Sequence, residues 1–144
     1  MSERIQKLLA QAGFGSRREI EEWLRAGRVR VNDEPAQLGD KAGTGDKIEL
    51  DGRVLVGEHH TNQNHHFGQL NVIQTLHEAG AKVAIGLEMF RKDSQSVLDQ
   101  WVAGNISEKQ FEEIYYDNWT YPWSVYRMIF EYARKEQIPM IGLN

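Results

Sequence analysis

The chain has 144 residues with 17 Lys and Arg, 21 Asp and Glu, five His and no Cys, so its formal net charge is −4. This length suits one ordinary domain or two small ones, and an apolar content of 40% with 26% charged residues is typical of a globular chain. The lack of Cys excludes disulfides, thiolate zinc sites and thiol nucleophiles. No stretch approaches the roughly 20 apolar residues of a membrane span, and the first residues lack the apolar core of a signal peptide, so we expect a cytoplasmic protein without a membrane partner.

The charged residues and the histidines are unevenly distributed along the chain. Residues 1–31 hold seven basic and four acidic residues, whereas residues 57–144 hold seven basic and eleven acidic ones. Four of the five histidines lie in the stretch RVLVGEHHTNQNHH, residues 53–66. This asymmetry predicts two units with different tasks, residues 1–55 and residues 56–144.

Two helices are predicted at the start of the first unit. Apolar residues recur at helical spacing between Ser2, a candidate N-cap, and Gly13, which predicts the first helix. Ser16 and Glu19 have the spacing of a capping box, which predicts a second helix that ends at Gly27.

A small β-ribbon is predicted after the two helices. The segment GRVRVND, residues 27–33, alternates apolar and basic side chains and predicts a strand. The segment DKIELDGRVLV, residues 46–56, has two β-rich runs around Asp51-Gly52 and predicts a hairpin. The first unit is therefore expected to be an α+β fold with two helices and an antiparallel ribbon.

Arginines from the start of the second helix, from its exposed face and from the strand are expected to form one cationic surface. A guanidinium group donates two parallel hydrogen bonds to a phosphate, and the unpaired N–H groups at a helix start also bind anions. Ser16, Arg17 and Arg18 would combine both effects. The alternative is a solvated face that serves only solubility, because the same helix carries three glutamates that weaken the positive field. On composition alone the two interpretations are equally supported.

The sequence RIQKLLAQAGFGSRREIEEWLRAGRVRVND, together with GDKIELDG, resembles the S4 RNA-binding domain over residues 3–55. The version that it resembles is the one at the N-terminus of bacterial ribosomal-RNA pseudouridine synthases. The resemblance implies binding of structured, rRNA-like RNA, with contacts from Lys7, Ser16, Arg17, Arg18, Arg25, Arg28, Arg30 and Asn32. A GRLD-like motif, which carries the catalytic aspartate of those synthases, does not follow, so pseudouridine synthase activity is not expected.

The second unit has the pattern of a parallel α/β fold. The predicted elements are strands at 54–57, 82–90 and 138–144, and helices at 67–80, 93–104, 107–116 and 121–137. Strands that alternate with helices predict a sheet of about three parallel strands with right-handed crossovers.

Polar side chains follow each of the three predicted strands, and in parallel sheets ligands bind at these strand ends. These side chains are Glu58, His59 and His60 after the first strand, Glu88 after the second, and Asn144 after the third. Carboxylate and imidazole groups together suit a divalent transition metal or a metal-activated water.

The blocks VGEHH, NHHFGQL and IGLEMF, and the segment from ISEKQF to the last residue, resemble the ChaN-like haem-binding, iron-regulated lipoprotein family over residues 54–144. That family belongs to a superfamily with Tiki-type metalloproteases and erythromycin esterases. The resemblance implies a cleft for haem or a metal at Glu58, His60, His66 and Glu88, and hydrolysis belongs to the relatives. Family domains continue past the third strand, so we expect a truncated α/β unit with at most vestigial hydrolase activity, and no enzyme is predicted.

Several alternatives remain open at this stage. The histidine stretch is either a polar loop without a ligand, a transition-metal site or a working enzyme site. The chain as a whole is a structured-RNA binding module, a haem- or metal-binding unit, or an engineered or recombined chimera without a selected function. The exposed edge of a three-stranded sheet also predicts a homo-oligomer.

Overall fold

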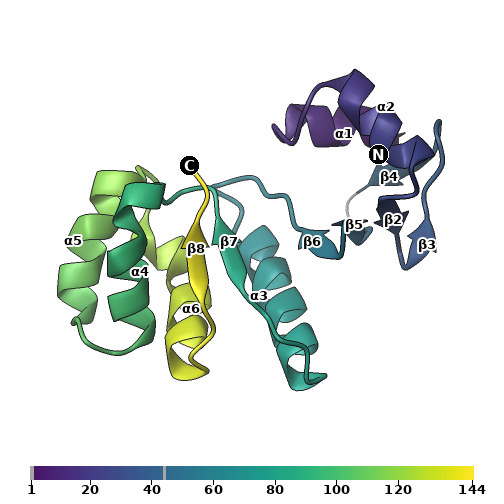
Figure 1. The fold of residues 1–144 in the computed structure, drawn as a ribbon. Coiled ribbons are helices and arrows are strands. Elements are labelled where there is room, and N and C mark those ends of the chain that lie inside the picture. Colours follow the sequence, from purple (N-terminus) through teal and green to yellow (C-terminus); the bar gives the residue numbers. More distant parts are fainter. Residues whose placement is uncertain (1, 44) are drawn as a thin grey trace. The chain divides into compact units, whose positions relative to one another are not determined.

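The computed structural model describes residues 2–43 and 45–144 (Figure 1). The chain forms two compact units, Met1–Gly57 and Glu58–Asn144, each with its own hydrophobic core. The sequence places the boundary after residue 55, and the structure places it after residue 57. In the described part of the chain no helix is long and apolar enough to cross a membrane.

The first unit contains two helices and short antiparallel strands. Its elements are β1 (Ser2–Arg4), α1 (Ile5–Gln11), α2 (Arg17–Arg25), β2 (Val29–Val31), β3 (Glu34–Pro35), β4 (Lys41–Gly43), β5 (Ile48–Leu50) and β6 (Arg53–Leu55). Strand β1 pairs with β4, and the other four strands form an antiparallel sheet in the order β3-β2-β5-β6. The two predicted helices and the predicted ribbon are therefore present.

Two tight turns define the ribbon. Asp51 and Gly52, between β5 and β6, have φ values of 52° and 76°, and Asn32 and Asp33, between β2 and β3, have φ values of 50° and 68°. Positive φ at both central residues is the geometry of the two-residue turn whose twist matches that of the flanking strands. The hairpin at Asp51-Gly52, which the sequence predicts, is confirmed.

The first helix begins later than the sequence suggests. Ser2 is not its N-cap, because residues 2–4 form β1, and Ser2 pairs with Gly43 of β4. The helix starts at Ile5, whose N–H donates to the carbonyl of Asp40 at 3.1 Å. Backbone partners on a distant segment therefore replace the local cap that the sequence predicts.

The core of the first unit lies between the two helices and the strands. Helix α1 contributes Ile5 and Leu9, and helix α2 contributes Ile20 and Leu24. The remaining buried members come from the strands and their loops, and they are Val29, Ala36, Ala42 and Leu50. The two helices pack against each other, α1 also contacts β1 and β4, and the start of α2 stays at the surface.

The second unit contains four α-helices, one 3-10 turn and two parallel strands within the described residues. Its elements are α3 (Gln63–Glu78), β7 (Ile85–Leu87), η1 (Lys92–Ser94), α4 (Gln95–Val102), α5 (Glu108–Asn118), α6 (Trp123–Lys135) and β8 (Met140–Gly142). The parallel register places Ile85 opposite Met140.

The expected sheet of three parallel strands has two strands in the described part of this unit. The predicted first strand, residues 54–57, instead contributes to β6, where Val54 pairs with Glu49 and Leu55 pairs with Ile48. The physical reason is local: the Asp51-Gly52 turn joins β5 and β6 directly, whereas a parallel pairing would have to close a much longer loop.

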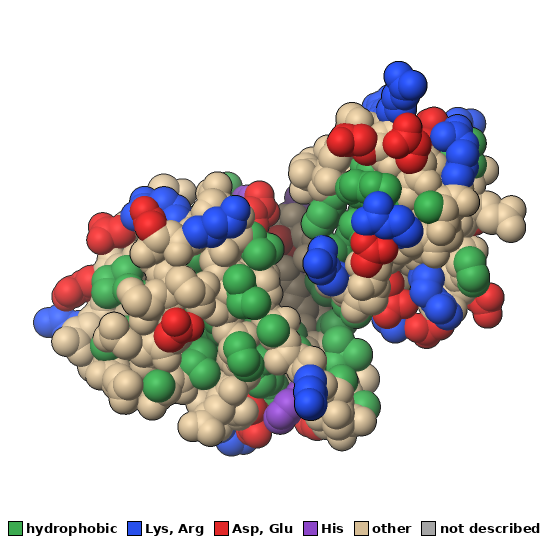
Figure 2. Space-filling view, viewed as in Figure 1, with side chains coloured by type: hydrophobic (Ala, Val, Ile, Leu, Met, Phe, Trp, Pro, Cys, Tyr) green, Lys and Arg blue, Asp and Glu red, His purple; other side chains and the backbone are tan. Residues whose placement is uncertain are grey.

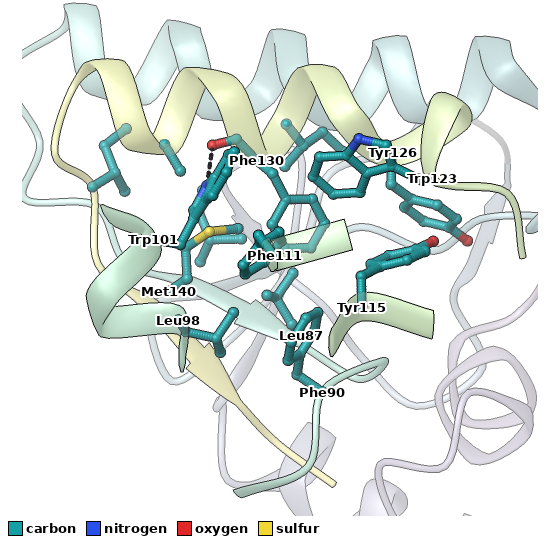
Figure 3. Packing of buried hydrophobic residues seen from close by; sticks show 14 residues of the cluster. Leu87, Phe90, Leu98, Trp101, Phe111, Tyr115, Trp123, Tyr126, Phe130 and Met140 are labelled. Atoms are coloured by element: carbon teal, nitrogen blue, oxygen red, sulfur yellow. Dashed lines mark hydrogen bonds between the residues drawn. The ribbon is translucent and has the colours of Figure 1, made fainter. Parts of the chain in front are cut away.

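Aromatic side chains dominate the core of the second unit (Figure 3). Trp101 of α4 stacks on Phe111 of α5 with ring centroids 4.4 Å apart, and its Nε1–H donates to the carbonyl of Phe130 at 2.8 Å. The hydroxyl groups of Tyr115 and Tyr126 lie at one end of this core (Figure 3). The aromatic residues of α5 and α6 therefore hold the helices together.

The outer edge of β8 is covered by one side chain, that of Gln95 at the start of α4. Its Nε2 donates to the carbonyl of Met140 at 2.8 Å, and its Oε1 accepts from the N–H of Gly142 at 3.0 Å. This amide thus pairs with alternating backbone groups of β8, as a neighbouring strand would.

We expect the Gln95→Ala variant to lose about 1–3 kcal/mol of unfolding free energy, because a carbonyl and an N–H of β8 would lose their partners in a partly buried position. Urea unfolding followed by tryptophan fluorescence would measure the loss. The control is Gln100→Ala, an exposed position on the same helix, where we expect a change within about 0.5 kcal/mol. Equal stability of the two variants would show that the Gln95 bridge does not stabilise β8.

Candidate functional site

Two exposed arginines without ion-pair partners in the described structure lie at the start of α2. Ser16 caps the helix: its Oγ accepts from the N–H of Glu19 at 3.2 Å, and its own N–H donates to Glu19 Oε2 at 2.7 Å. This capping box confirms the sequence prediction, and the hydrogen bond from the Ser16 N–H lowers the pKa of Glu19. Arg17 and Arg18 follow immediately and are exposed. Neither forms an ion pair with any described residue.

Most other predicted RNA contacts of the first unit are already paired with acidic side chains. These pairs are Lys7 with Glu3, Arg25 with Glu21, Arg28 with Asp51 and Arg30 with Glu49. Figure 2 shows the corresponding mixture of basic and acidic side chains on the surface of this unit (upper right). The cations of these four pairs are therefore locally compensated, whereas Arg17 and Arg18 at the start of α2 are not.

Arg28 forms the best-defined of these pairs. Its Nε lies 3.0 Å from Asp51 Oδ1 and its Nη2 lies 2.5 Å from Asp51 Oδ2, in a bidentate geometry. The guanidinium also lies over the ring of Trp23, 5.3 Å from its centroid. The Arg28 hydrogen bond lowers the pKa of Asp51, so the pair stays ionised at neutral pH. Binding a phosphate at Arg28 would require this pair to open.

Asn32 holds the turn between β2 and β3. Its Nδ2 donates to Asp46 Oδ1 at 2.8 Å, and its Oδ1 accepts from the N–H of Lys47 at 3.0 Å. Both ends of the side-chain amide are thus engaged within the unit. The structure gives Asn32 a role in the fold that sequence reasoning did not identify.

A second candidate site lies in the second unit, where Glu58, His60 and His66 converge. Glu58 and His60 belong to the loop before α3, and His66 lies in the first turn of that helix. Asn62 caps α3 by accepting from the N–H of Asn64 at 3.0 Å, which fixes the direction in which the helix leaves the loop. The exposed fractions of the Glu58, His60 and His66 side chains are 11%, 35% and 0%.

We call Glu58, His60 and His66 the histidine cluster. Within it, the Glu58 carboxylate contacts both histidine rings. Its Oε1 lies 2.8 Å from His60 Nδ1 and also accepts the hydroxyl of Tyr126 on α6. Its Oε2 lies 2.5 Å from His66 Nδ1. Burial and the hydrogen bond to Glu58 raise the pKa of Tyr126, so its hydroxyl keeps the proton that it donates.

His66 is engaged through both ring nitrogens. Its Nε2 lies 3.1 Å from the carbonyl of His60, and because a carbonyl only accepts, this nitrogen carries a proton. Its Nδ1 lies 2.5 Å from Glu58 Oε2 and 3.2 Å from Gln69 Oε1. The buried ring, which contacts the Tyr126 ring at a centroid distance of 4.2 Å, thus ties the loop to α3 and α6.

His60 differs from His66 because one of its ring nitrogens stays open. Its Nδ1 donates to Glu58, which leaves the lone pair of the neutral ring on Nε2. No hydrogen bond or ion pair engages this Nε2 within the described chain. Trp119 and Tyr121 flank the ring at centroid distances of 5.0 Å and 4.6 Å. The His60 ring is therefore oriented by the Glu58 carboxylate and flanked by two aromatic side chains.

Glu88 makes no hydrogen bond or ion pair with the histidine cluster in the described structure. It follows β7 and is exposed, and no hydrogen bond or ion pair joins it to another described residue. Across residues 2–43 and 45–144, no three or more His, Asp or Glu side chains are arranged to hold a metal ion. The structure therefore brings together three of the four cleft residues that the family resemblance implies.

Sequence reasoning missed the aromatic part of this site. Tyr126, Trp119 and Tyr121 all lie more than fifty positions after His60, in and before α6. The cluster of aromatic residues in DNWTYPW, residues 117–123, was the available signal, and it does not reveal which ring reaches the histidines.

Comparisons with known proteins assign the two units to different families. The family described as haem-binding uptake, Tiki superfamily, ChaN matches residues 46–144, and the S4 domain matches residues 3–48. Both resemblances drawn from the sequence are therefore confirmed.

Several curated relatives are similar to the S4 region of this chain. Ribosomal large subunit pseudouridine synthase B of Xylella fastidiosa is 54% identical over 56 residues, which are 39% of this chain and 12% of the relative. The proteins of the same name from Shigella flexneri and Escherichia coli are 53% identical over 57 residues, 38% of this chain and 20% of each relative. The chain thus spans between 12% and 20% of the length of these relatives.

Proposed function

We propose two binding functions for this chain. It belongs to the family described as haem-binding uptake, Tiki superfamily, ChaN, which matches residues 46–144, and its residues 3–48 match the S4 domain. The first function is binding of structured RNA by the first unit, without pseudouridine synthase chemistry. The second is haem binding by the second unit. The similarity to these synthases covers 56 or 57 residues, and a different family matches residues 46–144, so we do not extend their activity to this chain.

The observation that carries RNA binding is the pair Arg17 and Arg18, exposed and without ion-pair partners at the start of α2. Two forked donors beside a capped helix terminus form a ready anion site. Charges that are already compensated must first give up a partner, so these two arginines should contact phosphate first. Contacts of this kind recognise the backbone and shape of folded RNA more than its base sequence.

A titration with a ribosomal-RNA stem-loop across a salt series tests this function. Each neutralised phosphate should contribute about 0.7 to 0.9 to the slope of log affinity against log salt. A steep slope between about 50 and 200 mM KCl is the expected result. Weak binding that does not respond to salt would contradict the proposal.

The observation that supports haem binding is the open Nε2 of His60, whose ring is oriented by Glu58. A divalent ion without a macrocycle needs three or more protein ligands, whereas a porphyrin supplies four and needs only an axial one. A single imidazole with an oriented ring and aromatic neighbours therefore fits haem better than a bare ion. His60 would hold the iron, and bound haem would supply a centre for electron transfer or small-ligand binding.

We expect the full-length chain to shift the Soret absorbance of hemin with one-to-one stoichiometry, and we expect His60→Ala to abolish the shift. His77→Ala is the matched control, because His77 bonds to the hydroxyl of Tyr132 at 3.1 Å, outside the histidine cluster. The control should bind hemin as the unaltered chain does. Equal hemin binding by the two variants would exclude His60 as the ligand.

A further inference from the structure

Among the residues that the structure describes, Tyr126 is the one outside the histidine cluster that reaches all three of its members. Its hydroxyl donates to Glu58 Oε1 and lies 3.4 Å from His60 Nδ1, and its ring contacts that of His66. Only 1% of Tyr126 is exposed. The residue comes from α6, 68 positions after Glu58, so its place is set by the core of the unit and not by the loop itself.

The carboxylate of Glu58 has to serve two imidazoles with its two oxygens. Its Oε1 orients His60, and its Oε2 faces His66. A partial rotation about the last bond of the Glu58 side chain would move Oε1 out of reach of the His60 ring, whereas a half turn would restore the same contacts because the two oxygens are equivalent. The Tyr126 hydroxyl binds the same oxygen as His60 and therefore opposes the partial rotation.

We propose that Tyr126 is a positioning residue for His60 and acts through Glu58. By fixing the carboxylate, it keeps the proton of the neutral His60 ring on Nδ1 and the lone pair on the open Nε2. The positioning role matters for function only if the proposed haem binding holds, but the tautomer of His60 can be measured without haem. Partners that orient a ligating imidazole typically change ligand affinity by about 10- to 100-fold when they are removed.

The test compares Tyr126→Phe with Tyr132→Phe in the full-length chain. Tyr126 and Tyr132 both lie in α6, and each variant removes one hydroxyl that bonds to a histidine. The partner of Tyr132 is His77, which is not part of the histidine cluster. Long-range proton–nitrogen NMR spectra at neutral pH report which ring nitrogen of His60 carries the proton. We expect Nδ1 in the unaltered chain and in Tyr132→Phe, and a mixture with the Nε2-protonated form in Tyr126→Phe.

Hemin titration gives the second readout. We expect hemin affinity to fall about tenfold in Tyr126→Phe and to stay within about twofold in Tyr132→Phe. A changed tautomer without any hemin binding by the unaltered chain would refute the haem function and retain the positioning role. Normal hemin binding with an unchanged tautomer in Tyr126→Phe would overturn the positioning role and leave the haem function intact.

A measurement on the unaltered chain tests the positioning role even if the Tyr126→Phe variant does not fold. The hydroxyl proton of Tyr126 should exchange slowly with water and show a dipolar contact with the His60 ring. Rapid exchange without this contact would overturn the proposal even if no variant can be purified.

Discussion

Reversal of the two free charges at the start of α2, in the Arg17→Glu/Arg18→Glu variant, should lower the affinity for a ribosomal-RNA stem-loop by about a hundredfold near physiological salt. Each arginine is expected to contact one phosphate, so its loss should also lower the salt slope by about one. The two introduced carboxylates add repulsion, because they lie where the N–H groups of the helix start would otherwise attract an anion. Fluorescence anisotropy across a salt series would measure both the affinity and the slope.

The control must change the net charge by the same amount without touching this surface. Lys92→Glu/Lys109→Glu meets that condition, since both lysines are exposed in the second unit and form no ion pair in the described structure. We expect this control to lose less than about threefold in affinity, through the overall field alone. An equal loss in both variants would mean that only the net charge matters and that α2 is no specific contact.

The parts of the fold that the sequence predicted correctly depend on neighbours within a few positions. Ser16 and Glu19 form their capping box, and Ser107 starts α5 with a second one through Gln110. The Asp51-Gly52 turn closes the predicted hairpin. Caps and tight turns are readable because both partners of each hydrogen bond lie next to each other in the sequence.

The parts that were missed depend on partners that lie far away in the sequence. Strand β1 forms because Ser2–Arg4 pairs with Lys41–Gly43, about forty positions later in the sequence. The residues around Ser2 contain no pattern that predicts this pairing. The same limit explains the sheet of the second unit. An apolar run such as residues 54–56 suits a parallel strand and a hairpin strand equally, and the adjacent turn decided between them.

The candidate site shows the same division. The block from Glu58 to His66 was identifiable because a carboxylate and several histidines cluster in one short stretch. Which histidine stays available was not, since only the fold reveals that His66 is fully buried and that His60 is 35% exposed. Glu88 was placed in the cleft by its position after a strand, and its side chain turned out to be exposed and unpaired within the described chain.

Glu58 should therefore be the most sensitive residue of the second unit. His60 and the Tyr126 hydroxyl bond to one oxygen of its carboxylate, His66 Nδ1 lies 2.5 Å from the other, and its side chain is only 11% exposed. Each buried donor that loses its acceptor costs about 1–3 kcal/mol. We expect Glu58→Ala to lower the unfolding free energy of the second unit by about 2–6 kcal/mol, because both donors lose their acceptor.

Urea unfolding followed by tryptophan fluorescence can measure this loss, because Trp101, Trp119 and Trp123 all lie in the second unit. The matched control is Glu88→Ala, which removes an exposed carboxylate from the same unit and should change stability by less than about 0.5 kcal/mol. Glu58→Gln should fall between the two, because its amide oxygen still accepts one hydrogen bond while its NH₂ group faces imidazole donors. If Glu58→Ala were as stable as Glu88→Ala, the carboxylate would not be holding the two histidines and Tyr126 together. The proposed haem binding through an oriented His60 would then lose its structural basis.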